Sequence, residues 1–122
     1  MQLIAQFMTF TQEYQINVLQ PQGCLNLHQG EILREKLASL APQPYHLWVI
    51  DLAQVDFMDS SGLGALVDGL STTRAQGCRL VICNLQPAIR MIFELTQLDS
   101  QFEIFENYDA IKTTVNASPT TL

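Results

Sequence analysis

Basic side chains are scarce in this 122-residue sequence: six Lys and Arg stand against twelve Asp and Glu, and only 15% of the residues are charged. Nucleic-acid binding needs clustered Lys and Arg to displace counterions from phosphates, and the basic residues here are scattered. The same deficit disfavours attachment to anionic membrane surfaces. We therefore expect no nucleic acid and no membrane among the binding partners.

Uninterrupted apolar stretches are also short. None exceeds four residues, whereas a helix that spans a membrane needs ~20. The first ten residues lack the basic start and the apolar stretch of roughly 7–15 residues that mark a secretory signal. These features predict a cytoplasmic protein.

Cysteine and histidine are too few for a disulfide framework or a metal centre. Cys24, Cys78 and Cys83 are odd in number and lack CxxC spacing, so we expect reduced, structural thiols. His28 and His46 are the only histidines, and neither forms a ligand pair with a nearby Cys or His. The sequence predicts neither a metal nor a cofactor.

The pattern of apolar residues predicts alternating strands and helices. Period-two alternation over 11–19, followed by turn residues at 21–23 and a short strand at Cys24 and Leu25, indicates a hairpin. Helical spacing then covers about 28–41, and the continuously apolar segment 45–52 is typical of a buried central strand. The remaining expected elements are a helix from DSSG to Gly77, a strand at 79–84, a helix opened by Pro87, a short strand in FEIF and a helix over 108–115 capped by Asn107.

This order predicts an α/β fold: a single domain with a mixed central sheet, opened by a β-hairpin, and about four helices. We expect the domain to cover 1–115 and a flexible tail to follow at 116–122. The apolar residues within 1–10 are expected to extend the first strand or to cover a sheet edge. A homodimer contact through that segment is the alternative that the sequence leaves open.

The segment VDFMDSSGLGALVDGL, residues 55–70, combines two serines and an aspartate where a loop meets a helix. One of these side chains can accept a hydrogen bond from the free N–H groups of the first turn, which leaves the other two unexplained. Gly62 and Gly64 each cost the helix about 0.5–1 kcal/mol relative to Ala. We interpret this cost as the requirement for an open approach to the serine hydroxyls.

Enzymatic interpretations of this segment fail on spacing. The GxSxG of a nucleophile elbow is absent, Val67 stands where a dinucleotide fingerprint needs its third glycine, and GxxxxGK[ST] occurs nowhere. Asp51 and Asp56 suggest a phosphoaspartate receiver, but the acidic pair and the late lysine of that fold are missing. We therefore expect a protein that is not an enzyme.

The string VIDLAQVDFMDSSGLGAL, together with GCRLVICNLQPAIRMIFELTQLD and FEIF, resembles a STAS domain of the bacterial anti-sigma factor antagonist type. The resemblance covers nearly the whole chain, and DSSGLG is its specific part. It implies that the second serine of DSSG, Ser61, is phosphorylated by an anti-sigma factor that is also a serine protein kinase. It also implies that a serine phosphatase of the 2C type reverses the modification.

One position departs from the family pattern. Family members often carry GxLD after the second strand, and here the residues are Gly23, Cys24, Leu25 and Asn26. Asn26 keeps the size of the aspartate but removes its charge, which would alter phosphorylation rate or kinase choice. Alternatively, Asn26 caps the following helix together with Gln29 three residues later.

From the exposed position expected for the two serines, our hypothesis is that the unmodified domain docks its partner through the start of the DSSG helix and its flanking loops. The expected partner-binding residues are Asn26, Leu27, Met58, Asp59, Ser60, Ser61, Gly62 and Leu63. The alternative function is that of a STAS subunit or scaffold in a larger assembly, which makes constant contacts and is not phosphorylated.

Overall fold

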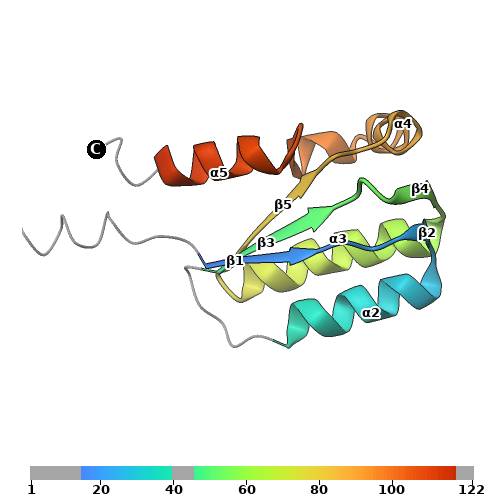
Figure 1. Ribbon diagram of the computed structural model, residues 1–122. Helices are drawn as coiled ribbons and strands as arrows, with labels where there is room; N and C mark the ends of the chain where they lie inside the picture. The colour runs from blue at the N-terminus through green and yellow to red at the C-terminus, as the bar shows by residue number, and fades with distance from the viewer. Residues whose placement is uncertain (1–14, 40–45, 118–122) are drawn as a thin grey trace, which may run out of the picture.

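The computed structural model of the chain describes residues 15–39 and 46–117, in which strands and helices alternate (Figure 1). The strands are β1 (Gln15–Leu19), β2 (Gly23–Leu25), β3 (His46–Asp51), β4 (Val55–Met58), β5 (Arg79–Cys83) and β6 (Glu103–Phe105). The helices are α2 (Leu27–Ala38), α3 (Ser60–Ala75), α4 (Pro87–Leu95) and α5 (Tyr108–Ala117), with a 3₁₀ turn, η1, at Leu98–Ser100. The predicted α/β class is confirmed, and the described residues contain four helices, in agreement with the predicted number of about four.

The predicted hairpin at the start of the fold is wrong. β1 and β2 do not pair with each other: β1 runs parallel to β3, and β2 runs parallel to β4. Gln15 lies opposite His46, 31 positions later, and Leu25 lies opposite Met58, 33 positions later. The chain therefore bends at residues 21–23 without reversing its direction. The segment that joins β3 to β4 bends in the same way, through the turn at residues 53–54. Gly23 makes this bend with a positive φ of 73°.

The larger sheet has the strand order β1-β3-β5-β6, and each pair of neighbours is parallel. Parallel strands need helical crossovers between them, which the helices provide. Within residues 15–39 and 46–117, the pair formed by β2 and β4 is parallel as well. The segment 1–10, predicted to extend a strand or cover an edge, lies outside the described residues.

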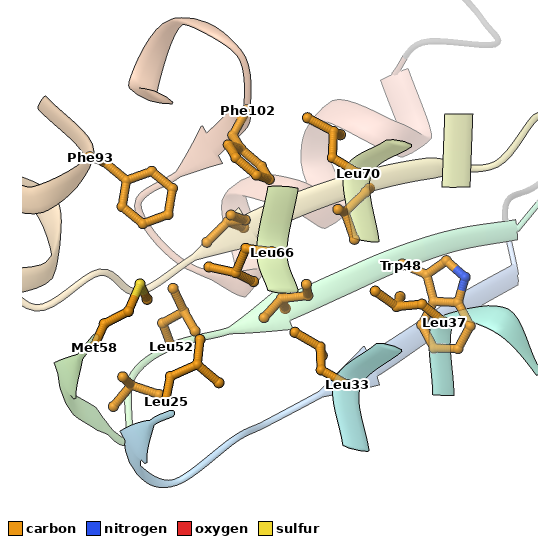
Figure 2. Packing of buried hydrophobic residues seen from close by; sticks show 14 of the residues in the cluster. Leu25, Leu33, Leu37, Trp48, Leu52, Met58, Leu66, Leu70, Phe93 and Phe102 are labelled. Atoms are coloured by element: carbon orange, nitrogen blue, oxygen red, sulfur yellow. The ribbon is translucent and has the colours of Figure 1, made fainter. Parts of the chain in front are cut away.

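The sheet is buried on both faces, as the apolar run in 45–52 predicts. Trp48 and Ile50 belong to a core shared with α2, α3 and α4, and Figure 2 shows Trp48 within it. Leu47 and Val49, which alternate with them, pack instead with Ile111 and Val115 of α5. Alternate side chains of each central strand therefore pack against the helices on opposite faces of the sheet.

Local signals placed the helix ends well. Asn26 Oδ1 accepts a hydrogen bond from the Gln29 N–H at 3.1 Å, so Asn26 is the N-cap of α2. Asn107 Oδ1 likewise accepts from Ala110 N–H at 2.9 Å, and Pro87 is the first residue of α4. Helix α5 ends two residues beyond the predicted domain boundary at 115. Residues 118–122 lie outside the described part of the chain.

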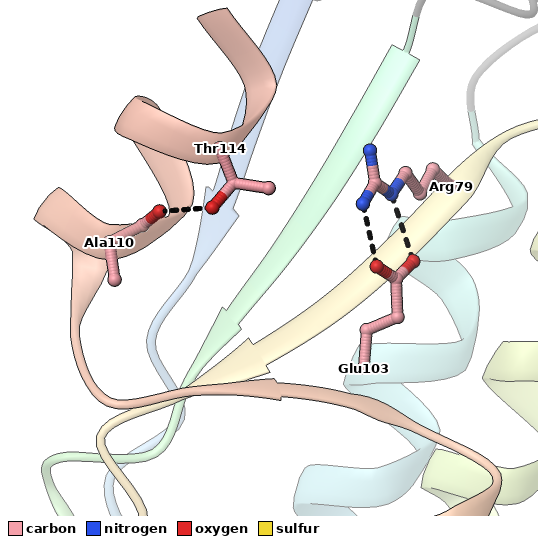
Figure 3. Close-up of polar contacts among 4 residues, drawn as sticks. All are labelled: Arg79, Glu103, Ala110 and Thr114. Atoms are coloured by element: carbon pink, nitrogen blue, oxygen red, sulfur yellow. Dashed lines mark hydrogen bonds and ion pairs between the residues drawn. The ribbon is translucent and has the colours of Figure 1, made fainter. Parts of the chain in front are cut away.

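The outer strand β6 is joined to β5 by a bidentate ion pair. Arg79 Nε and Nη2 donate to the two carboxylate oxygens of Glu103 at 2.8 and 2.6 Å (Figure 3). Helix α5 follows β6 in the chain.

No disulfide joins the three cysteines, of which Cys78 and Cys83 are buried. Every helix in 15–39 and 46–117 is too short or too polar to cross a membrane.

Candidate functional site

The start of helix α3 is capped by an aspartate, which leaves two serine hydroxyls outside the cap. Asp59 Oδ1 accepts a hydrogen bond from the Gly62 N–H at 2.9 Å, and the Asp59 carbonyl accepts from Leu63 N–H at 3.0 Å. Ser60 is exposed and Ser61 is half-buried. Neither hydroxyl forms a hydrogen bond within the described residues, so each is chemically available at the N-terminal end of α3.

The two glycines of DSSGLG have different roles. Gly62 is buried, and a Cβ at this position would overlap the carbonyl oxygen of Leu25 and lie 2.6 Å from its carbonyl carbon. A Cβ on Gly64 would meet nothing within 4 Å. The interpretation of Gly62 as an opening toward the serines is therefore wrong, because Gly62 lets α3 pack directly on the backbone of β2. It contacts its own chain and is not a surface residue for a partner.

The first turns of α2 and α3 lie side by side. The Asp59 N–H donates to the Leu25 carbonyl at 3.3 Å. A Cβ on Gly30 would lie 2.8 Å from Ala65 Cβ and 3.6 Å from the Ser61 carbonyl oxygen, so the two helices are in close contact here. This packing brings the capped start of α2 at Asn26 and the start of α3 at Ser61 to one end of the fold.

The predicted apolar contacts at this end differ in exposure. Leu27 is 55% exposed and Leu63 is half-buried against the core. Met58 is only 5% exposed and packs in the core, so its assignment to the binding surface is wrong. Its neighbour Phe57 is 58% exposed and was missed. No period-two signal identifies it, because both Val55 and Met58, three positions apart, point inward.

The charge at this end is negative. Asp56 is exposed and Asp59 is half-buried, and they are the only charged residues in 55–66. A negative group added to Ser61 would therefore join two carboxylates already present on the same strand-to-helix segment. The helix N-terminus itself favours a negative charge, since its free N–H groups carry partial positive charge.

A polar network occupies the carboxyl ends of the central strands. Burial raises the pKa of Asp51, but hydrogen bonds from Gln20 Nε2, the Ala53 N–H and Asn84 Nδ2, each 3.0 Å long, outweigh burial and leave that pKa below its ordinary value. Burial, with the adjacent Asp51 charge, raises the pKa of the Cys83 thiol to about 11. The Asp51 carboxylate thus ties three strand-end segments together.

The chain belongs to the STAS domain family, whose model matches residues 8–111. Its relatives include anti-sigma factor antagonists. The chain is 33% identical to the anti-sigma-B factor antagonist of Bacillus subtilis over 92 residues, which covers 75% of this chain and 81% of the relative.

Two solved structures of other proteins have the same fold. A sulfate transporter family protein of Wolinella succinogenes superposes with a TM-score of 0.77 at 12% identity, covering 87% of this chain and 88% of the other. The phosphorylated form of the Bacillus cell fate determinant SpoIIAA superposes with a TM-score of 0.62 at 24% identity, covering 81% and 90%.

Proposed function

We propose that this protein is an anti-sigma factor antagonist controlled by phosphorylation of Ser61. The bare form binds an anti-sigma factor that is also a serine kinase, and the phosphorylated form releases it. A serine phosphatase of the 2C type restores the bare form. In this proposal the protein acts in the cytoplasm, regulates transcription through its partner and catalyses no reaction itself.

One observation carries the proposal: the hydroxyl of Ser61 is not used by the fold. Asp59 provides the cap of α3, and Gly62 provides the close contact with β2. Ser61 is half-buried and forms no hydrogen bond through its side chain within the described residues. The similarity to the Bacillus subtilis antagonist supports the same assignment.

Phosphorylation would leave the domain folded. The phosphate adds about −1.5 to −2 charges at the N-terminal end of a 16-residue helix. A negative group in this position gains roughly 0.3–1 kcal/mol from the helix dipole. No rearrangement of this chain is needed for the switch.

The partner is the molecule that the phosphate would repel. The phosphate would join Asp56 and Asp59 on a segment of six residues, within reach of the ~8 Å Debye length at physiological salt. Like charges facing each other across an interface cost several kcal/mol. A loss of ~3 kcal/mol weakens binding more than a hundredfold, which is sufficient for release.

Asn26 modifies the switch in this proposal. Its side chain caps α2 and therefore already has a structural role. Because it carries no charge, the surface beside Ser61 has one carboxylate fewer than the family pattern. We expect Asn26→Asp to preserve the cap while changing the rate of phosphorylation.

The test combines mass spectrometry with binding. Incubation with the anti-sigma factor kinase of the same organism and ATP should add one phosphate to the wild type and none to Ser61→Ala, with Ser60→Ala as the matched control that is still modified. In calorimetry, Ser61→Ala should bind the kinase as the wild type does, and Ser61→Asp over a hundredfold more weakly. Equal affinities for Ser61→Ala and Ser61→Asp would contradict the switch and favour a STAS subunit with constant contacts.

A further inference from the structure

Helix α4 carries apolar side chains on two of its sides. Ile89 and Phe93 are buried in the core, whereas Met91 and Leu95 are 59% and 78% exposed. Residues three and four apart share one side of a helix, so Ala88, Met91 and Leu95 form one exposed stripe. On α2, α3 and α5, as far as the structure describes them, no two large exposed apolar residues have this spacing. We call these three residues the α4 stripe.

The helix that carries the α4 stripe lies near the candidate site. Helix α4 packs against β4, which carries the exposed Phe57 and leads directly into the cap of α3 (Figure 1). Arg90, on another side of α4, reaches Glu106 beyond β6 at 3.8 Å, so the stripe lies on a different side from that ion pair. Exposed apolar side chains of α4 and β4 therefore flank the same end of the fold as Ser61.

The charges around the stripe select the kind of partner. Asp56, Glu94 and Asp99 are exposed on β4, α4 and η1 respectively. Arg90, the one cation of α4, is already paired with Glu106. A second copy of this chain, whose net charge is −6, would bring the same carboxylates to the contact. Charge complementarity instead favours an apolar surface edged by Lys and Arg.

We infer that the α4 stripe, with Phe57, is a second docking surface for the partner anti-sigma factor, and that it contacts an apolar region of the partner bordered by basic residues. This inference rests on the proposed function. The stripe is separate from Ser61 in the chain, and phosphorylation of Ser61 changes none of its residues. Its contribution to binding should therefore be the same in both phosphorylation states.

The experiment measures binding of the purified anti-sigma factor of the same organism by calorimetry. Met91→Ser and Leu95→Ser should each weaken binding about tenfold, because a buried apolar anchor is lost from the interface. Ile32→Ser is the matched control: Ile32 is 36% exposed on α2, which lies away from α4 in the fold (Figure 1). It should change the affinity less than twofold. Raising the salt from about 50 to about 500 mM should weaken wild-type binding, since it screens the basic rim.

Combined variants separate this inference from the switch. Leu95→Ser should lower affinity by the same factor in the wild type and in Ser61→Asp, because substitutions at independent sites act additively. Unchanged affinity in Leu95→Ser, with weak binding of Ser61→Asp, would overturn the docking surface and leave the switch intact. Weak binding of Leu95→Ser, with equal affinities for Ser61→Ala and Ser61→Asp, would support the surface and overturn the switch. Self-association in sedimentation that Leu95→Ser abolishes would show that a second copy covers the stripe, and would also overturn the inference.

Discussion

The two glycines of DSSGLG allow one substitution to be compared at two neighbouring positions. Gly62→Ala places a methyl group against the Leu25 carbonyl, with the carbonyl carbon only 2.6 Å away. The obstacle is backbone, so no rotamer change relieves the overlap. Overpacking of this kind typically costs 1–3 kcal/mol, which exceeds the ~0.5–1 kcal/mol that alanine contributes to a helix relative to glycine. We expect a net loss of about 1–2 kcal/mol.

Gly64→Ala is the matched control. The added methyl group meets nothing within 4 Å, so only the gain in helix propensity remains. We expect this variant to be more stable than the wild type by about 0.5–1 kcal/mol. The same chemical change should therefore act with opposite sign at positions two residues apart.

Urea unfolding followed by the fluorescence of Trp48 is a suitable assay. Trp48 is the single tryptophan and is 5% exposed in the core, so its emission should report the loss of packing. Unchanged m-values would show that the midpoints report stability. If Gly62→Ala proved as stable as Gly64→Ala, the close contact between α3 and β2 would not exist in solution, and the conclusion that Gly62 lets α3 pack on the backbone of β2 would fail.

Two further predictions concern single side chains. Asp59→Ala should lower the free energy of unfolding by about 1 kcal/mol, because it removes the α3 cap. Asp59→Asn should keep most of that stability, because its amide oxygen can still accept the hydrogen bond from the Gly62 N–H. Equal losses for the two variants in thermal unfolding would argue against capping. Because burial raises the folded pKa of Cys83 from 9.0 to about 11, its contribution to stability is complete below the unfolded pKa of 9.0 and is lost as the pH rises through 11. The loss should reach roughly 2–3 kcal/mol, and the stability difference between wild type and Cys83→Ala in urea should shrink over that range; a constant difference would contradict the raised pKa.

Local sequence signals predicted those features that depend only on neighbouring residues. Asn26, Asn107 and Pro87 stand where helices begin, because a cap or a missing N–H acts within one turn. The apolar run in 45–52 likewise gave a strand buried on both faces. The apolar stripe that follows DSSG located α3, and the family resemblance is confirmed by the family model that matches residues 8–111.

Features that depend on distant contacts were predicted poorly. The turn residues between β1 and β2 signal a bend, but only pairing with β3 and β4 decides whether the chain reverses. Met58 and Gly62 were assigned to the surface because they flank the serines, and their burial depends on the core and on Leu25 across the fold. The exposed Phe57 was missed for the same reason.

The brevity of β6 matters when the protein is crowded among other chains. An outer strand exposes unpaired N–H and C=O groups that a foreign strand can use as a template for amyloid-like growth. Here that template is three residues long, carries the charge of Glu103, and is followed within two residues by a helix. We expect this side of the molecule to resist aggregation even at high cellular concentration.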